Sequence, residues 1–268
     1  MAKESSGGRT YRTRSASRAL EILACFSQRQ PELTLNEICE LTGLPKPTVF
    51  RLLSVLESAR FVERCPGKDK YQVGIKAFEV GCVFLSHLSV ERVARPIMDS
   101  LSKQFHLSVN LGILDQGQVV YLAVSEPDTL FRYIPIIGYR HYVHCSALGK
   151  VLVAPLPEEQ VDEILATIGM PALTPHTITT PRAFKEHLAW VCQQGYSTDI
   201  QEGGLGFCCL AVPIHNHEGK VVAAMSISGS IAHFDHDGIR TFAAAMKEAA
   251  AQVSAGLGYG NTPEANSA

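Results

Sequence analysis

Residues 34–73 constrain the fold more than any other part of this chain, because they specify two short helices, a tight turn between them, and then a hairpin. Thr34 and Glu37 have the spacing of a capping box, which predicts a helix that begins directly after the threonine. Gly43 suits the left-handed conformation that ends a helix, and Pro47 suits the first turn of the next one. This order of elements is that of a winged helix-turn-helix, whose second helix fits the major groove of DNA.

The second of these helices has two different faces. Apolar residues recur on one face at the spacing of buried helix positions: Val49, Leu52, Leu53 and Leu56. The other face carries the residues that we expect to meet DNA: Lys46, Pro47, Thr48, Phe50, Arg51 and Ser54. In a groove, Arg51 can bind a guanine edge or a phosphate, and Phe50 can contact thymine methyl groups. The alternative is a helical hairpin with a solvated, charged face.

A further helix and a hairpin complete the predicted unit. Residues 15–28 are expected to form its first helix, with one face made of Ala16, Ala19, Leu20 and Leu23. Residues 61–64 and 70–73 are expected to pair as strands around a turn that contains proline and glycine. Lys68 and Lys70 lie at the tip of this hairpin, where we expect them to contact phosphate groups.

The charge distribution divides the chain in the same place. The net charge of the whole chain is −2, but residues 1–75 are basic on balance, and residues 76–268 are acidic. This asymmetry indicates a DNA-binding module, expected at 14–74, that is joined to a domain with another role. Residues 1–13 are expected to be a disordered basic tail, with an arm for the minor groove as the alternative.

Composition excludes several classes of protein. Hydrophobic residues make up 46% of the chain, which is enough for packed cores. No apolar run approaches the length of a membrane span, and no signal peptide is recognised, so we expect a cytoplasmic protein with no membrane partner. The cysteines are irregularly spaced and include no C-x-x-C pair, so we expect them to be mostly small buried residues.

The rest of the chain is predicted to be α+β in class, with helices flanking a mostly antiparallel sheet. A linker helix is expected at 75–91, a second domain at 92–256 and a flexible tail at 257–268. Within this domain we expect helices at 93–105 (with Pro96 in the first turn), 146–154, 158–169, 181–195 and 237–253, and strands at 107–114, 119–125, 130–137, 207–216 and 220–230.

A candidate pocket follows from the pattern of the last strands. Ser226 and Ser228 are two residues apart, so both hydroxyls face one side of their strand, and Met225 and Ile227 face the other. Residues 146–148 open a helix, where free backbone N–H groups favour a carboxylate. Hydroxyls among small apolar side chains, together with such a helix start, are typical of a pocket that binds a small anion without a salt bridge.

Metal binding and catalysis are the competing chemistries. His141 and His144 form the only close histidine pair that lies beside a cysteine, Cys145, whereas a zinc site needs three or four converging ligands. No nucleophile motif surrounds Cys209, and its neighbour Cys208 points to the opposite face of a strand. We therefore expect no metal, no cofactor and no enzyme activity, and we do not favour a disulfide switch.

The chain resembles the IclR family of bacterial transcriptional regulators over nearly its whole length. The matching stretches are SASRALEIL, LTLNEICELTGLPKPTVFRLLSVLE, RPIMDSL, VVYLAV, HCSALGKVLVAPLP, ALTPHTITTP, QQGYSTD, CCLAVPI and GKVVAAMSISG. The resemblance implies an N-terminal winged helix-turn-helix and a C-terminal, GAF-like effector-binding domain. It also implies a homodimer or homotetramer that binds a palindromic operator in double-stranded DNA and regulates catabolic operons in response to a small organic acid.

The same resemblance implies which residues bind the effector. By motif, these are Ala147, Leu148, Asp199, Phe207, Cys209, Ser226 and Ser228. This chain departs from the family where Asp199 is followed by Ile200-Gln201-Glu202, where Cys208 replaces a common arginine, and where Phe207 replaces a smaller aliphatic residue. These departures bear on the size and identity of the effector. The alternative for the pocket is that the serines bond neighbouring backbone and that Cys209 belongs to the core.

A second function is kept open by the sequence. The chain could be a cytosolic small-molecule or metal sensor whose winged helix mediates protein contacts instead of DNA binding. Binding to the DNA upstream of its own gene separates the two functions.

Overall fold

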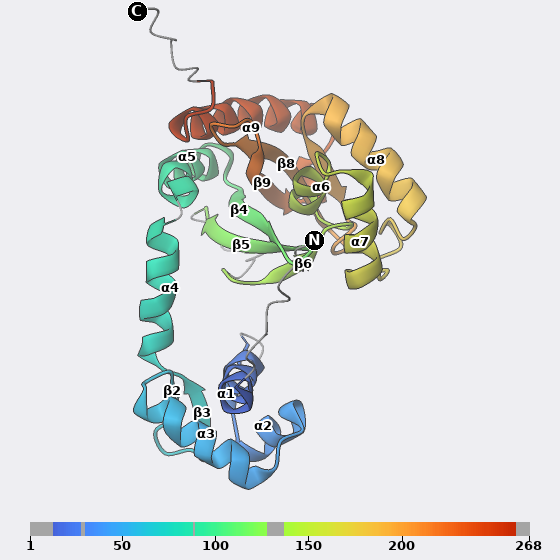
Figure 1. The fold of residues 1–268 in the computed structure, drawn as a ribbon. Coiled ribbons are helices and arrows are strands. Elements are labelled where there is room, and N and C mark those ends of the chain that lie inside the picture. The colour runs from blue at the N-terminus through green and yellow to red at the C-terminus, as the bar shows by residue number, and fades with distance from the viewer. Residues whose placement is uncertain (1–12, 28–29, 88, 128–136, 261–268) are drawn as a thin grey trace, which may run out of the picture. The chain divides into compact units, whose positions relative to one another are not determined.

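The computed structural model describes residues 13–27, 30–87, 89–127 and 137–260 (Figure 1). The chain divides into two compact units, and the first ends at His87. Most of the strand predicted at 130–137 lies outside the described residues, as do most residues of the two predicted tails.

The first unit is a winged helix-turn-helix, as the sequence predicts. Its elements are α1 (Arg14–Cys25), β1 (Glu32–Leu33), α2 (Leu35–Thr42), α3 (Lys46–Ser58), β2 (Val62–Arg64), β3 (Tyr71–Val73) and α4 (Ile75–His87). The three strands form an antiparallel sheet in the order β1-β3-β2. Strand β1 is not predicted by the sequence, because two residues have no periodicity of their own and depend on pairing with Tyr71 and Gln72.

Local sequence fixes the ends of α2. The Thr34 side chain accepts a hydrogen bond from the Glu37 backbone N–H (3.2 Å), and the Glu37 carboxylate accepts one from the Thr34 N–H (2.7 Å), so the predicted capping box is confirmed. Gly43 ends the helix with φ +67°, which the glycine adopts without steric strain. Pro47 lies in the first turn of α3. Of the predicted stripe, Val49, Leu53 and Leu56 are buried, and Leu52 is half-buried against the same core.

The predicted apolar face of α1 is only half correct, because Ala19 and Leu23 pack against the core of this unit but Ala16 and Leu20 do not. Leu20 is 66% exposed and Ala16 is exposed, whereas Ile22 is fully buried. The stripe that packs against the other helices runs through Ala19, Ile22 and Leu23, which also have helical i, i+3, i+4 spacing. Two apolar stripes overlap in this helix, and only packing against α2 and α3 determines which of them is buried.

The second unit contains one six-stranded sheet and its covering helices. Its elements are α5 (Ser89–Phe105), β4 (Ser108–Asp115), β5 (Gln118–Ser125), β6 (Arg140–Tyr142), α6 (Ala147–Val153), α7 (Glu158–Ile168), α8 (Pro181–Gln194), β7 (Ser197–Ile200), β8 (Phe207–His215), β9 (Val221–Ser230), a 3₁₀ turn (Ile231–His233) and α9 (His236–Gly256). The strand order is β6-β5-β4-β9-β8-β7, and the neighbouring strands are antiparallel. The predicted α+β class is confirmed.

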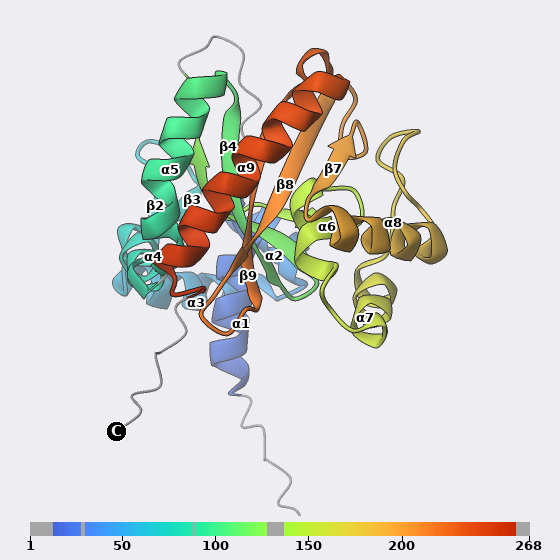
Figure 2. The same cartoon turned by 90° about the horizontal axis from the view of Figure 1, so that it is seen from above.

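The sheet has a separate core on each face. Helices α5 and α9 lie side by side over one face (Figure 2), where Leu210, Met225 and Ile227 are buried. Helices α6 to α8 cover part of the other face, where Ala211 and Ala224 are buried. The alternation predicted for β9 is therefore confirmed, because Met225 and Ile227 pack under α5 and α9 and the two serines face the other side.

Two parts of the prediction for the linker helix and the second unit differ from the structure. Helix α5 begins at Ser89, so Pro96 lies in its interior and not in its first turn, and the linker helix α4 ends at His87 and not at 91. Burial of Val90 and Ala94 extends α5 across the proline. The short strands β6 and β7 are not predicted either, because their pairing with β5 and β8 is what makes them strands.

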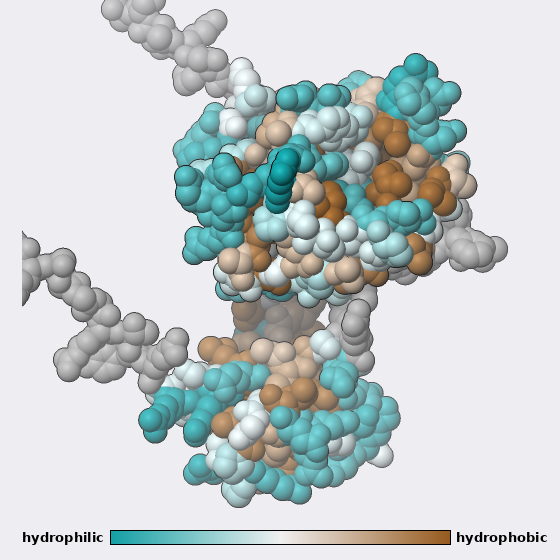
Figure 3. All heavy atoms as spheres, turned by 90° about the vertical axis from the view of Figure 1, so that its right-hand side faces the viewer, coloured by the Kyte–Doolittle hydropathy of each residue, from teal (hydrophilic) through white to brown (hydrophobic). Residues whose placement is uncertain are grey.

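Apolar side chains remain at the surface of the first unit, and Figure 3 shows hydrophobic patches there among hydrophilic atoms. Four large ones lie on α4: Ile75, Phe78, Val80 and Val83. Among the described residues, no helix is long and apolar enough to cross a membrane.

Candidate functional site

Helix α3 presents the predicted DNA-binding face to solvent. The side chains of Lys46, Pro47, Phe50, Arg51 and Ser54 are exposed, and Thr48 is half-buried. Phe50 is 51% exposed although it is a large aromatic residue. Arg51 forms no ion pair with any residue in the described part of the chain, so its guanidinium is available to a base or a phosphate.

The hairpin of β2 and β3, which is the wing, carries Lys68 and Lys70. It differs from the face of α3 because one of these lysines already has a partner. The Lys68 ammonium lies 2.9 Å from both carboxylate oxygens of Glu32 in β1. The hydrogen bond to this carboxylate raises the pKa of Lys68. Contact of Lys68 with phosphate therefore competes with Glu32, whereas Lys70 forms no ion pair with a described residue. The sequence did not reveal this pair, because its members are 36 residues apart.

The second unit encloses a small cavity on the face of the sheet next to α6. It is lined by Tyr121, His141, Ser146, Ala147, Leu148, Asp199, Gly203, Gly204, Phe207, Cys209 and Ser226. Six of the predicted effector residues therefore converge on it, and only Ser228 lies beside the cavity without lining it. Its volume of about 20 Å³ has room for roughly one water molecule, so any larger occupant requires the wall to move.

One end of the cavity is formed by the start of α6. The Ser146 hydroxyl caps this helix by accepting a hydrogen bond from the Gly149 N–H (3.1 Å). A Cβ atom at Gly149 would lie 2.4 Å from the Val143 Cα, so only glycine fits there. Helix α6 has seven residues, so we assign its contribution to the backbone N–H groups of Ala147 and Leu148 and not to a long helix dipole.

A buried network of charged groups joins α6 to the loop after β7. Lys150 is fully buried and donates to the Thr198 carbonyl (2.9 Å) and to the Glu202 carboxylate. The Asp199 carboxylate accepts hydrogen bonds from the backbone N–H groups of Glu202 (2.6 Å) and Gly203 (3.3 Å). Burial raises the pKa of Asp199 to about 7 and also raises the pKa of Glu202. The network holds the loop that carries Gly203 to the cavity.

No lysine or arginine lines this cavity among the described residues. Lys150, the one cation in the predicted effector segments, already forms an ion pair with Glu202. His141 lines the wall, and burial lowers the pKa of its imidazole, which favours the neutral ring. An anion in the cavity would therefore be held by hydrogen-bond donors and not by an ion pair.

The two serines do not bond neighbouring backbone. The Asn110 amide nitrogen donates to the hydroxyls of Ser226 (3.3 Å) and Ser228 (3.0 Å), and the Ser228 hydroxyl donates to the Cys209 sulfur (3.1 Å). Burial raises the pKa of the Cys209 thiol, which disfavours the thiolate that a nucleophile would need. Sequence reasoning missed Asn110, because its place opposite Ser226 depends on the pairing of β4 with β9.

No metal site is apparent in the described ranges, where no three histidine, cysteine or acidic side chains come together to hold an ion. His141 Nδ1 lies 3.9 Å from the Cys145 sulfur, but His144 Nε2 contacts the Pro171 carbonyl (3.1 Å) instead of joining them.

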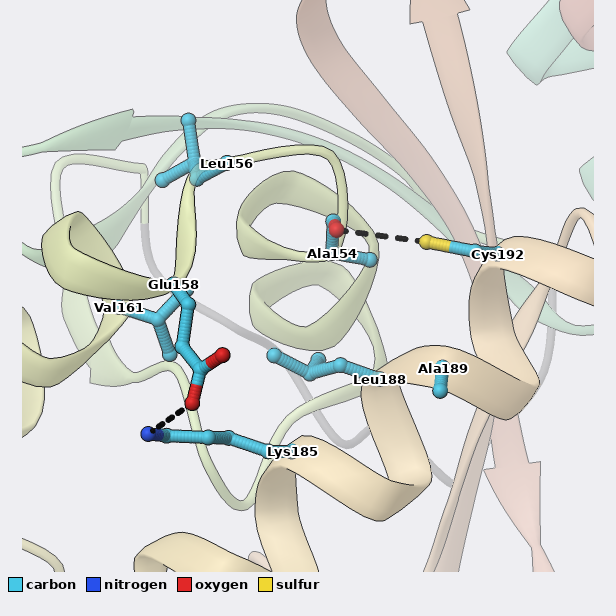
Figure 4. Close-up of a pocket in the computed structure, with 8 residues that line it drawn as sticks. All are labelled: Ala154, Leu156, Glu158, Val161, Lys185, Leu188, Ala189 and Cys192. Carbon is cyan, nitrogen blue, oxygen red and sulfur yellow. Dashed lines mark hydrogen bonds and ion pairs between the residues drawn. The ribbon is translucent and has the colours of Figure 1, made fainter.

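A second hollow, of about 200 Å³, lies between α6, α7 and α8 (Figure 4). Its polar groups are already paired. Lys185 lies 2.8 Å from Glu158 at the rim, and the Cys192 thiol donates to the Ala154 carbonyl (3.3 Å). None of the predicted site residues lines this hollow, so we place the candidate effector site at the smaller cavity.

The winged helix-turn-helix and the exposed face of α3 define the class of this protein as DNA-binding. Two family models match the chain: the IclR helix-turn-helix domain over residues 15–66, and the C-terminal domain of the bacterial transcriptional regulator IclR over residues 82–255. The chain therefore belongs to the IclR family, whose members are transcriptional regulators and not enzymes.

Three similar proteins illustrate the family. The HTH-type transcriptional regulator XynR of Escherichia coli is 33% identical over 245 residues, which is 91% of this chain and 97% of XynR. The transcriptional repressor IclR of the same organism is 32% identical over 253 residues, or 94% and 92%. An IclR homologue from Microbacterium hydrocarbonoxydans, in complex with 4-hydroxybenzoate, has the same fold, with a TM-score of 0.81 and 23% identity over 91% of this chain and 98% of that chain.

Proposed function

We propose that this regulator acts on a catabolic operon and is controlled by a small organic acid bound in the cavity next to α6. The observation that carries the proposal is the convergence of Ala147, Leu148, Asp199, Phe207, Cys209 and Ser226 on that cavity. Backbone N–H groups, a hydroxyl and a carboxyl that can be protonated near neutral pH are groups that can hold a carboxylate without a cation. The complex of the Microbacterium homologue with 4-hydroxybenzoate is consistent with this chemistry.

The size of the cavity bears on how the effector enters. The volume leaves room for roughly one water molecule, and Phe207 is 36% exposed at the edge of the wall. We infer that Phe207 and the segment at Gly203 and Gly204 move outward to admit the acid. The effector can alter DNA binding only by its different affinity for the two states of the regulator.

A thermal-shift screen tests the effector assignment. Short keto acids, aromatic acids and sugar acids are added to the full-length protein, and binding of one class raises the midpoint of unfolding of the second unit. The Ser226→Ala variant should lose this stabilisation. If no acid shifts the midpoint, or if the shift is the same in the variant, the cavity is not the effector site.

Replacing Arg51 with alanine tests the DNA-binding face. We expect affinity for operator DNA to fall by about 1–3 kcal/mol, with relaxed preference at one base, because the exposed guanidinium is lost. Fluorescence anisotropy with operator and random duplexes measures both effects. The matched control is Arg182→Ala in α8, which removes an exposed arginine from the second unit and should leave DNA affinity unchanged. Unchanged affinity in Arg51→Ala would contradict the assignment.

We also propose that the regulator binds its palindromic operator as a homodimer or a pair of dimers in the cytoplasm. One winged helix reads only a few base pairs, so two are needed for useful specificity. The exposed apolar residues of α4 form a surface that a second copy would cover.

Replacing Phe78 with glutamate tests this assembly. Phe78 is 67% exposed, so the change should be tolerated by the fold of one copy. We expect the sedimentation coefficient to fall toward that of a monomer and operator affinity to fall at least about tenfold, because two recognition helices are no longer linked. Leu173→Glu, at an exposed apolar position of the second unit, is the control. If Phe78→Glu sediments like the unaltered protein, α4 is not the dimer contact.

A further inference from the structure

Asn110 occupies a central place between the two serines of the candidate effector site. It lies on β4 directly opposite Ser226 of β9, and Ser228 follows on the same face two residues further along. Its side chain is buried, with 1% exposure, and its amide nitrogen lies 3.3 Å from the Ser226 oxygen and 3.0 Å from the Ser228 oxygen. Because the amide NH₂ group has two protons, it can donate one to each serine.

The direction of these hydrogen bonds decides what each serine can do next. A hydroxyl has a single proton, so a serine oxygen that accepts from Asn110 can still donate once. Ser228 donates its proton to the Cys209 sulfur, at 3.1 Å. Ser226 has no acceptor for its proton in the described part of the chain, and it lines the cavity, whereas Ser228 does not.

Stability alone does not account for an asparagine at this position. The Asn110 carbonyl oxygen is buried and has no hydrogen-bond partner among the described residues. An unpartnered buried carbonyl lowers the stability of the fold, and an apolar residue of similar size would avoid that loss. The amide is better explained by the orientation that it imposes on the hydroxyls.

We infer that Asn110 is a positioning residue that makes Ser226 a hydrogen-bond donor toward the cavity, so that the site selects an effector with an acceptor oxygen, of a carboxylate or a carbonyl, at this point. Ser228 then acts through Asn110 and Cys209 and does not contact the effector. The inference rests on the proposed function for the identity of the cavity, and it extends that function by separating the roles of two serines that the family resemblance treats alike.

The orientation of the amide is measurable without any effector. In full-length protein labelled with ¹⁵N-asparagine, Asn110→Leu identifies the Asn110 side-chain signals by their loss. We expect both amide protons to exchange with solvent much more slowly than those of the exposed Asn36. Ser226→Ala and Ser228→Ala should each shift a different one of the two protons. Exchange as fast as that of Asn36, or no response to either substitution, would overturn the inference.

Binding of acids then tests the selectivity. Acetate, pyruvate and 4-hydroxybenzoate are titrated calorimetrically into the unaltered protein and into the two serine variants, which are matched because each removes one hydroxyl from β9. For an acid that binds, we expect Ser226→Ala to weaken affinity about tenfold or more, and Ser228→Ala less than about threefold. Equal losses of affinity in the two variants would overturn the inference that the two serines have separate roles. Failure of all three acids to bind would count against the proposed function, while the amide signals would still decide the role of Asn110.

Discussion

Replacing Lys150 with methionine is expected to destabilise the second unit by about 3–5 kcal/mol, because the Glu202 carboxylate would remain buried without its cation. One oxygen of that carboxylate already lacks a partner among the described residues, so the loss of the ammonium leaves the buried charge with only a backbone hydrogen bond from Ile200. The single tryptophan, Trp190, lies on α8, so its fluorescence during urea denaturation reports on this unit alone.

The double variant Lys150→Met with Glu202→Met is the control for that experiment. Removing both charges should restore most of the stability, because two apolar side chains of similar size replace a buried ion pair without leaving a charge behind. A single variant within about 1 kcal/mol of the unaltered protein would show that the buried pair is not what holds the loop against the cavity.

The second large effect on stability is expected when the pH changes, because the Asp199 carboxyl titrates near neutral pH. Burial raises the pKa of this carboxyl from 3.8 to about 7, so the folded protein binds a proton more tightly than the unfolded chain does. A group with a raised folded-state pKa contributes stability that is complete below the unfolded-state pKa and is lost as pH rises through the folded-state pKa. The contribution of Asp199 therefore declines between about pH 4 and 7, by roughly 4 kcal/mol at most.

Asp199→Asn should remove that dependence. The asparagine oxygen can still accept from the backbone of Glu202 and Gly203, but the residue cannot ionise. We expect the variant to resemble the unaltered protein at pH 5 and to be more stable at pH 8, by several degrees in the unfolding midpoint. Parallel pH profiles for the two proteins would contradict a protonated Asp199. If the effector is an acid, its affinity for the unaltered protein should also fall from pH 6 to 8.

Sequence reasoning succeeded where the determinants are local. The capping box of Thr34 and Glu37, the left-handed Gly43 and the stripe of α3 each depend on residues within one or two helical turns. The alternation along β9 is local as well, and it gave the correct faces for Ser226 and Met225.

The failures all involve partners that are distant in sequence. The pairing of Lys68 with Glu32, the place of Asn110 opposite Ser226, and the contribution of His141 to the cavity arise only when separate strands and loops come together. The burial of Ile22 in place of Leu20 has the same cause, because α1 carries two apolar stripes and its neighbours determine which one is buried.

The most direct test of the account is DNA binding measured with and without the acid that shifts the unfolding midpoint. A fragment of the DNA upstream of the gene is titrated with the unaltered protein, with Arg51→Ala and with Ser226→Ala. The account predicts that the acid changes the affinity of the unaltered protein, that Ser226→Ala binds DNA normally but no longer responds, and that Arg51→Ala binds weakly under both conditions. If the unaltered protein protects no stretch of that DNA, or if Ser226→Ala responds fully to the acid, the account is contradicted.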